Sequence, residues 1–344
     1  MLKNLLVALI NTIVALGVSV VVYELVRSQN YERWHSKYEN TVNSHSGLTM
    51  ASSDPILMWE YRPKREFVHP EFLTVTRTNE YGFRQKSGVH PSPPAGTRRI
   101  AFIGDSVTLG REVQFEQIFS QVTEAILNGR TESVRHEALN FGIDGYNTPQ
   151  IQRQLMTKVF RYSPDLVIYA LSLNDFDFEE SSGEKIRFFR KPQSFLLEDL
   201  ARVSRRLFAN DYHTYYFNKN KEAVFEGIGA MQAAAGKRGV GFLTIILPVF
   251  RADRLSRLGH TRVFQIESFD DYHLRPMHDE IARELRARGV NTIDFLPRFS
   301  DSGLSPEAFA YDIWHMNARG HDLVGQGVAE LLIQSDTISL PASP

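Results

Sequence analysis

Apolar segments alternate with longer stretches of helical periodicity over most of this chain. The apolar segments are apolar throughout rather than at every second residue, as in Asp165–Leu171, which reads Asp-Leu-Val-Ile-Tyr-Ala-Leu. Strands of this kind belong to sheets that are covered on both faces. Strand–helix alternation favours parallel strands joined by right-handed crossovers, so the sequence predicts a three-layer α/β/α sandwich around a parallel sheet of about five strands. These strands are expected at 100–104, 138–141, 165–171, 242–247 and 291–295.

The helical stretches between these strands include one region that breaks the alternation. Residues 176–220 contain an amphipathic stretch at 195–208 and the basic and aromatic run 187–191. We expect this insertion to lie over the strand ends, with the basic run exposed. The helices that connect the strands are expected at 113–127, 148–160, 221–238, 271–288 and 319–334.

The N-terminal segment Leu5–Val22 is almost entirely apolar, and its 18 residues are just enough to span a bilayer as a helix. A cleaved signal peptide has a shorter apolar core followed by a small-x-small site. The best candidate for that site, Ala15-Leu16-Gly17, lies inside the apolar run. The sequence therefore favours an uncleaved transmembrane signal anchor over a buried core helix. The large domain that follows is expected on the extracytoplasmic (periplasmic) side of the membrane.

The same features divide the chain into three parts. Residues 1–26 are the predicted anchor, 27–97 a juxtamembrane linker with an accessory segment, and 98–335 the main domain. Within the accessory segment, residues 54–84 mix aromatic side chains with prolines and charges. This composition suggests short strands or extended segments that pack on the main domain.

Charge and cysteine content exclude several classes of function. The 344 residues carry a net charge of -1, so no overall basic field would attract nucleic acid. The chain has no cysteine, which excludes disulfides, thiolate catalysis and zinc–cysteine sites. It also contains no P-loop, no Gly-x-Gly-x-x-Gly dinucleotide motif and no His-Glu-x-x-His motif.

Polar residues follow several predicted strands at the edge where parallel sheets bind their ligands. Ser106 comes directly after the first strand, in the sequence Gly-Asp-Ser, and by itself could be no more than a helix N-cap. Gly145 lies in the turn after the second strand, and Asn174 follows the third. Asp312 and His315 stand just before the last helix. All five are expected to meet at one edge of the sheet.

The chemistry of these side chains is complementary. A serine hydroxyl is barely nucleophilic without a base, and His315 can take the proton of Ser106. Asp312 can accept a hydrogen bond from the other ring nitrogen and stabilise the imidazolium. The N–H groups of Ser106 and Gly145 and the side-chain amide of Asn174 can donate to a tetrahedral oxyanion. The pattern predicts nucleophilic catalysis by Ser106, His315 and Asp312, with no metal.

Other polar residues near these turns have simpler interpretations. Asp105 is expected to be a structural hydrogen-bond acceptor, and Asp175 to hold loop backbone. His321 is expected to pack near the start of the last helix. His273 and His278 are expected on a solvated helix face rather than at a metal site.

Four sequence blocks, in this order and spacing, resemble those of the SGNH, or GDSL-type, hydrolases. The first is Gly104-Asp105-Ser106, the second Asn140–Gly145, and the last Asp312-x-x-His315. The third block usually reads Gly-x-Asn-Asp and is Ser172-Leu173-Asn174-Asp175 here, which keeps the asparagine but not the glycine. The resemblance covers about residues 98–335. It implies a flavodoxin-like sandwich and ester hydrolysis by a Ser-His-Asp triad, with no cofactor.

The predicted function is that of a serine esterase that hydrolyses short-chain or acetyl esters through a covalent acyl-enzyme on Ser106. Two alternatives stay open. One is an O-acetyltransferase or deacetylase acting on an extracellular polysaccharide, since an acyl-enzyme can be resolved by water or by a sugar hydroxyl. The other is a catalytically silent SGNH-like binding protein, for which Ser172 is the only sequence hint. The expected partners are an acyl ester, including O-acylated carbohydrate, and the membrane, but not nucleic acid.

Overall fold

A computed structural model describes residues 2–39, 48–69, 73–130, 134–178, 191–208, 212–255, 261–312 and 314–337. Most of the basic and aromatic run at 187–191 lies outside these residues, and Lys191 is its only described member.

The centre of the fold is a five-stranded, fully parallel sheet with the order β11-β8-β7-β5-β6. When the five strands are numbered in chain order and read across the sheet from β6 to β11, the order is 2-1-3-4-5, as in flavodoxin-like sheets. The predicted α/β/α class and the predicted strands are confirmed. Their bounds are β5 Thr97–Ile103, β6 Arg135–Asn140, β7 Leu166–Leu171, β8 Gly241–Ile246 and β11 Thr292–Asp294.

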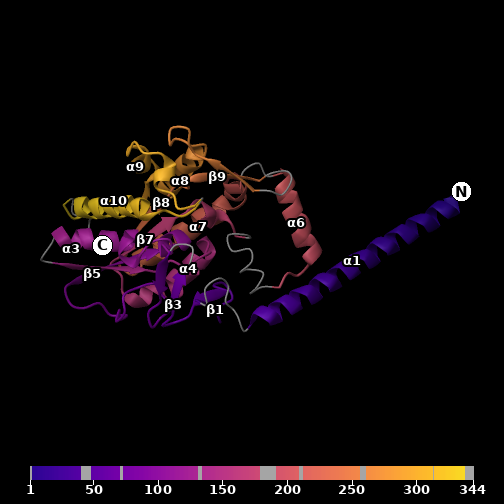
Figure 1. Ribbon diagram of the computed structural model, residues 1–344, viewed down its shortest axis with the longest axis horizontal. Coiled ribbons are helices and arrows are strands. Elements are labelled where there is room, and N and C mark those ends of the chain that lie inside the picture. The colour runs from indigo at the N-terminus through magenta and orange to yellow at the C-terminus, as the bar shows by residue number, and fades with distance from the viewer. Residues whose placement is uncertain are drawn as a thin grey trace.

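Helices cover both faces of this sheet, as the uniformly apolar strands require. On one side α3 (Phe119–Arg130) packs along α10 (Ala318–Thr337). On the other, α7 (Tyr212–Gly236) packs against α4 (Thr148–Thr157) and α8 (Arg275–Ala287) (Figure 1). The central strand β7 is consequently buried along its whole length after Leu166. Its register with β5 pairs Ile100 with Leu166.

The helix boundaries differ from the expected ones in two places. The stretch expected to be helical from 113 is a loop with a 3-10 turn at Phe115–Gln117 before α3 begins. In contrast, α7 begins nine residues before the expected 221, in a segment rich in tyrosine and asparagine that has poor helix propensity. The amphipathic helix of the insertion is confirmed as α6, Phe195–Phe208. The remaining short elements are η2 Val159–Tyr162, η3 Leu173–Phe176, β9 Arg251–Leu255, β10 Thr261–Gln265, α9 Leu296–Ser300 and η4 Pro306–Ala308.

The accessory segment forms two antiparallel hairpins that pack on the main domain. The first pairs β1 (Thr49–Ala51) with β2 (Trp59–Tyr61), and the second pairs β3 (Glu66–His69) with β4 (Thr74–Arg77). Trp59 is completely buried and belongs to the same apolar core as the central strands.

The N-terminal helix α1 runs from Leu2 to Glu39 and projects away from the globular body (Figure 1). It is longer than the apolar run, because the polar residues after Val22 continue the same helix. Its apolar side chains are exposed, and Leu5–Arg33 is long and apolar enough to cross a membrane.

One expectation about α8 is wrong. His278 does not lie on a solvated face, because its side chain is fully buried and Nδ1 lies 2.8 Å from Asp294 Oδ1. His278 lies on the buried face of α8 together with Met277 and Ile281, and this face packs against β11 at the edge of the sheet.

Candidate active site

Ser106 occupies the sharp connection between β5 and the single helical turn α2 (Ser106–Leu109). The N-cap of this turn is Asp105, whose Oδ1 accepts a hydrogen bond from the Val107 N–H at 2.9 Å. The cap is therefore not Ser106 itself. The serine hydroxyl is left to face the last part of the chain, and the residue is 6% exposed.

His315 lies between Ser106 and Asp312, within hydrogen-bond distance of both. Its Nε2 is 2.9 Å from Ser106 Oγ, and its Nδ1 is 2.7 Å from Asp312 Oδ2. Asp312 Oδ1 accepts the backbone N–H groups of Trp314 and His315, each at 2.8 Å. The carboxylate is thus fixed by its own turn. Because an ionised Asp312 can only accept, Nδ1 carries a proton, and in the neutral form of the imidazole Nε2 is then the nitrogen that accepts from the serine.

Gly145 lies in the loop after β6, which presses closely against the α2 turn. A side chain at Gly142 would meet the Leu109 nitrogen at 2.2 Å, so only glycine permits this approach. Gly145 has a φ of +76°, in the left-handed region that favours glycine. The Asn140 side chain adds a hydrogen bond to the Thr108 carbonyl at 2.9 Å. The two loops expected to carry oxyanion donors are therefore packed together.

Asn174 is oriented by the aspartate beside Ser106. Its Nδ2 donates to Asp105 Oδ2 at 2.8 Å, and since an amide nitrogen carries two hydrogens, the second is left for another acceptor. The Ser172 hydroxyl donates to Asp105 Oδ1 at 3.3 Å. Asp105 is therefore a buried acceptor that holds this loop, and its burial raises its pKa.

Ser172, which replaces the glycine usual at this position, fits the backbone without strain. Its φ of -97° and ψ of 151° are extended and suit any residue. Its N–H donates to Asp175 Oδ2 at 3.0 Å, and the same oxygen accepts the Tyr169 hydroxyl at 2.8 Å. The expectation that Asp175 holds loop backbone is confirmed.

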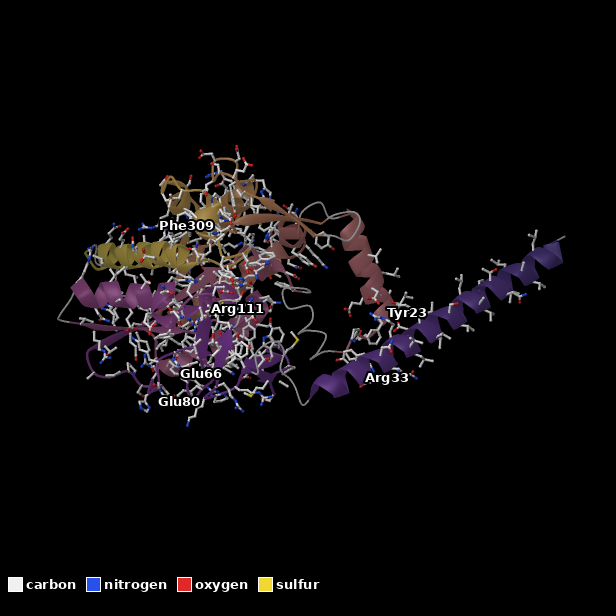
Figure 2. All side chains as sticks on the ribbon, viewed as in Figure 1. Tyr23, Arg33, Glu66, Glu80, Arg111 and Phe309 are labelled. Carbon is white, nitrogen blue, oxygen red and sulfur yellow. The ribbon has the colours of Figure 1, made fainter. Side chains whose placement is uncertain are left out.

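Glu112 is a second carboxylate beside the histidine and was not singled out from the sequence. Its side chain is 1% exposed, and Oε1 lies 3.5 Å from His315 Nδ1. The same oxygen accepts Arg111 Nε at 2.7 Å, while Arg111 also reaches Asp144 Oδ2 at 3.4 Å. Figure 2 labels Arg111 in the globular body, and its side chain is 25% exposed. In a sequence, an Arg-Glu pair after a turn is typical of a solvated surface, so no sequence pattern indicated that Glu112 is buried.

The two carboxylates decide the protonation of His315. Burial by itself lowers the pKa of the imidazole, but Glu112 and Asp312 outweigh it and raise that pKa to about 9. Burial also works to raise the pKa of Asp312, but its hydrogen bonds to His315 bring it below the usual value. The pKa of Glu112 is raised by burial. His321 differs: it is buried, stacks on Phe119, and burial lowers its pKa to about 3, so it stays neutral.

Among the described residues, Glu112, Asp312 and His315 form a group that could supply cation ligands, since one ligand atom of each lies within 4.8 Å of the others. The geometry fits a hydrogen bond better. Zinc bonds of about 2.0–2.1 Å in a tetrahedral site would separate two ligand atoms by roughly 3.3 Å. The 2.7 Å between His315 Nδ1 and Asp312 Oδ2 leaves a proton between them, not a metal.

The accessory hairpins brace the loop that carries Gly145. The Trp59 indole donates to the Asp144 carbonyl at 3.2 Å, and the Asp144 N–H donates to the Tyr61 hydroxyl at 3.1 Å. The Tyr146 hydroxyl donates back to the Trp59 carbonyl at 2.5 Å. Trp59 and Tyr61 thereby fix the backbone of Asp144, just before Gly145, and Trp59 also holds the side chain of Tyr146, just after it.

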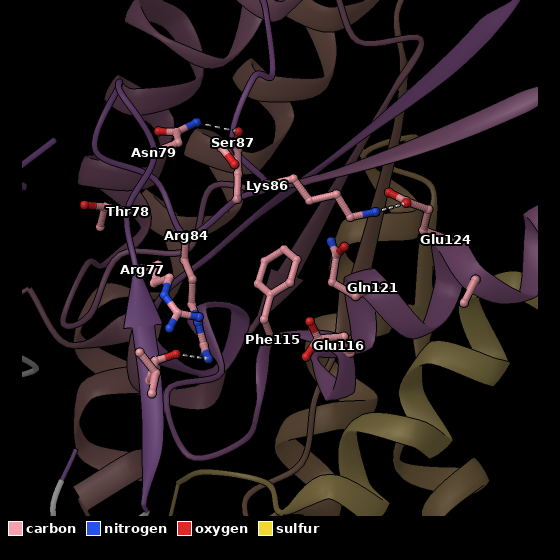
Figure 3. Close-up of a pocket in the computed structure, with 13 residues that line it drawn as sticks. Arg77, Thr78, Asn79, Arg84, Lys86, Ser87, Phe115, Glu116, Gln121 and Glu124 are labelled. Atoms are coloured by element: carbon pink, nitrogen blue, oxygen red, sulfur yellow. Dashed lines mark hydrogen bonds and ion pairs between the residues drawn. The ribbon is translucent and has the colours of Figure 1, made fainter. Parts of the chain in front are cut away.

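A separate cavity of about 580 Å³ lies where β4 and residues 84–87 face the start of α3 (Figure 3). None of Ser106, Asp312 and His315 lines it. Two of its charges, Lys86 and Glu124, pair with each other across the opening. The fully buried Arg84 links the cavity wall to the segment that follows α2, because its guanidinium donates to the carbonyls of Gly110 and Val113.

Comparison with known proteins assigns the chain to a family. The model of the GDSL-like lipase/acylhydrolase family matches residues 102–323, which is more than half of the chain and includes both Ser106 and His315. The comparison with curated proteins finds no match.

Solved structures similar to this chain include several acylhydrolases and esterases. A putative acylhydrolase from Bacteroides fragilis NCTC 9343 is 14% identical, with a TM-score of 0.40, over 71% of this chain and 91% of that one. The acetylxylan esterase Axe2 from Geobacillus stearothermophilus is 15% identical, with a TM-score of 0.43, over 68% and 93%. A two-domain esterase active on acetylated mannans is 16% identical, with a TM-score of 0.45, over 72% and 52%.

Since the family model matches most of the main domain, including the segments around Ser106 and His315, the chain belongs to the GDSL-like lipase/acylhydrolase family and is an ester hydrolase.

Proposed function

We propose that this protein is a serine esterase whose nucleophile is Ser106, with His315 as general base and Asp312 as the group that orients it. The observation that carries the proposal is the line of contacts from Ser106 Oγ to His315 Nε2 at 2.9 Å and from His315 Nδ1 to Asp312 Oδ2 at 2.7 Å. Nucleophile, base and orienting acid within hydrogen-bond reach are the arrangement that serine acyl transfer requires.

In the first half of the reaction, the Ser106 oxygen attacks the ester carbonyl while His315 Nε2 takes the hydroxyl proton. The carbonyl oxygen becomes an oxyanion that accepts from the N–H groups of Ser106 and Gly145 and from the Asn174 amide. Collapse of this intermediate breaks the bond to the alcohol, which leaves with the proton from His315. In the second half, a water oxygen attacks the acyl-serine while His315 Nε2 takes a proton from that water. Collapse of the second intermediate breaks the bond to Ser106 Oγ, which takes the proton back from His315 as the acid is released.

Short acyl groups, acetyl above all, are the substrates that we propose. Ser106 is 6% exposed and His315 5% exposed, so little space is open directly above the nucleophile. A small acyl group can reach a serine in such a position more readily than a long chain. An O-acylated carbohydrate would leave its bulky part outside, with only the acyl group entering.

Hydrolysis and transfer to a sugar share the acyl-enzyme and differ in the acceptor. We therefore propose hydrolysis as the basic activity and O-acetyl transfer or deacetylation of an extracellular polysaccharide as the alternative. Following a labelled acetyl group, with and without an acetyl-free polysaccharide as acceptor, separates the two. Label that appears in the polysaccharide would favour transfer.

We also propose that α1 anchors the domain to a membrane, with the body on the extracytoplasmic side. The support is the apolar segment Leu5–Val22, whose larger side chains are exposed all along the helix.

The experiment that tests the active site compares wild type with Ser106→Ala. We expect hydrolysis of p-nitrophenyl acetate to fall by roughly 10⁴-fold or more in the variant, because the nucleophile is removed. A fluorophosphonate probe should label wild type and not Ser106→Ala, whereas Ser302→Ala, a change at an exposed serine, should behave like wild type. Unchanged hydrolysis in a folded Ser106→Ala protein would refute the proposal. A wild type that neither hydrolyses esters nor reacts with the probe would favour a silent binding protein.

A second variant tests the proposed oxyanion donors. We expect Asn174→Ala to lower kcat by roughly 100- to 1000-fold, the usual effect of losing one such donor, with a smaller change in KM. A rise in KM with kcat unchanged would assign Asn174 to substrate binding instead.

A further inference from the structure

The helix α6 presents a stripe of apolar side chains to solvent. Leu197, Leu200 and Val203 are 67%, 54% and 51% exposed. They are spaced three residues apart, which places them on neighbouring positions of one helix face. An exposed apolar stripe of this kind is typical of a surface that contacts another protein or a membrane.

The first turn of α6 is fixed to the N-terminal helix α1 through Glu24. This side chain accepts the backbone N–H groups of Phe195 and Leu196, each at 2.9 Å, and the Ser194 hydroxyl at 2.6 Å. Glu24 therefore satisfies the unpaired N–H groups at the start of α6, as a capping residue would, although it lies about 170 residues away in the chain.

A second set of contacts fixes the next turn of α6 to the same part of α1. Asp199 accepts the Tyr23 hydroxyl at 2.6 Å and pairs with Arg27 at 2.9 Å. The Arg27 guanidinium also lies 5.7 Å above the Phe195 ring. Tyr23 is placed where α6 meets α1 (Figure 2). In the described part of the chain, α1 is the main neighbour of α6.

The position of these contacts along α1 indicates what the apolar stripe of α6 contacts. They begin at Tyr23, directly after the apolar segment Leu5–Val22. Eighteen helical residues are about 27 Å long, close to the thickness of the hydrocarbon core of a bilayer. With this segment in the bilayer, Tyr23 lies at the membrane–water interface, where tyrosine is enriched. The first turns of α6 are then held at the level of the lipid headgroups. In Figure 1, α6 also lies between the globular body and the N-terminal half of α1.

We propose that α6 is an interfacial helix that lies on the bilayer and inserts Leu197, Leu200 and Val203 at the boundary between headgroups and acyl chains. The inference rests on the proposed anchoring by α1. Helices of this type bury their apolar face roughly 5–10 Å into that boundary. Together, α1 and α6 hold the catalytic body at a fixed height and orientation above the lipid surface.

The absence of cysteine from the chain permits a direct test with single labels. The full-length protein carrying Leu200→Cys or Val203→Cys is labelled with an environment-sensitive fluorophore and reconstituted into phosphatidylcholine–phosphatidylglycerol vesicles. Vesicles with brominated acyl chains then report contact with lipid by quenching. Val14→Cys, inside the apolar segment, is the control for anchoring, and Leu304→Cys, exposed on the body, is the control for water.

We expect the labels at 200 and 203 to be quenched, less than the label at 14 and clearly more than the label at 304. Quenching at 14 combined with a response at 200 and 203 equal to that at 304 would overturn the role of α6 and leave the anchor intact. Shielding of 200 and 203 from water without quenching by bromine would show that a protein surface, such as a second copy, covers the stripe, and would refute the lipid assignment. No quenching at 14 would refute both the anchor and the inference that rests on it. Ester hydrolysis is measured separately and does not enter these outcomes.

Discussion

At the scale of single residues, we expect the position of His315 between two carboxylates to set the pH dependence of the proposed reaction. The imidazole acts as a base only in its neutral form, and its pKa is raised from 6.5 to about 9. We expect kcat/KM for an acetyl ester to increase about tenfold per pH unit below that value and to level off above it. A pH–rate profile checks this. A profile that is already flat at neutral pH would show that the pKa of His315 in the free enzyme is not raised.

Glu112→Gln separates the contribution of Glu112 from that of Asp312. The amide keeps the size of the side chain and removes its charge 3.5 Å from His315 Nδ1, so the acid limb of the profile should move to lower pH. Glu116→Gln, at an exposed glutamate on the nearby 3-10 turn, should leave the limb in place. If both variants keep the wild-type profile, Glu112 has only a packing role.

At the scale of elements, the accessory hairpins should affect catalysis through the loop that contains Gly145. Tyr61→Phe removes the acceptor of the Asp144 N–H. Leaving a buried N–H without a partner costs about 1–3 kcal/mol, so the free energy of unfolding should fall by that amount. We expect kcat to fall by up to about tenfold as Gly145 loses its fixed position, with KM nearly unchanged.

Tyr81→Phe is the matched control, because Tyr81 lies in the same segment and is 43% exposed. Denaturant unfolding and steady-state kinetics on both variants decide the question. Equal, small effects of Tyr61→Phe and Tyr81→Phe would mean that the hairpins do not position the loop.

The elements that the sequence predicts well are those with an unbroken pattern. The segments around Ile168 and Phe102 are continuous apolar runs, and their strands are found within a few residues of the expected bounds, although β5 begins three residues early at Thr97. The start of α7 could not be predicted, because its first turns are aromatic and polar and become helical only by packing on neighbouring elements. His278 was misplaced for a related reason: its burial depends on the packing of α8 against β11, where Asp294 contacts its ring, and local periodicity does not indicate that partner.

The predicted site residues come together because each follows a strand or precedes a helix, and parallel topology places these ends at one edge. Ser106, Asp312 and His315 were accessible to this reasoning. Glu112 and Arg111 were not, because their position depends on the irregular loop between α2 and α3 and on contacts with Asp144. Such contacts between loops leave no periodic trace in a sequence.

At the scale of the whole molecule, membrane attachment should depend on the apolar segment of α1. Arginine at the centre of a membrane helix costs about 2.5–3.5 kcal/mol on insertion scales, so the double change Leu9→Arg and Ile13→Arg should release the protein from carbonate-washed membranes. Leu304→Arg, on the surface of the body, should leave attachment unchanged. Retention of the double variant in the membrane fraction would contradict anchoring by α1.

The distance along the chain between Ser106 and His315 has a consequence for the timing of biosynthesis. The two residues are 209 positions apart, the first directly after the opening strand of the sheet and the second just before the final helix. At roughly 5–20 residues per second, the ribosome adds the histidine about 10–40 s after the serine. During that interval the growing polypeptide has the proposed nucleophile but not the proposed base. On the proposed mechanism, hydrolysis begins only after the whole sheet has been synthesised, and a chain that stops before Asp312 could build every strand and still hydrolyse nothing.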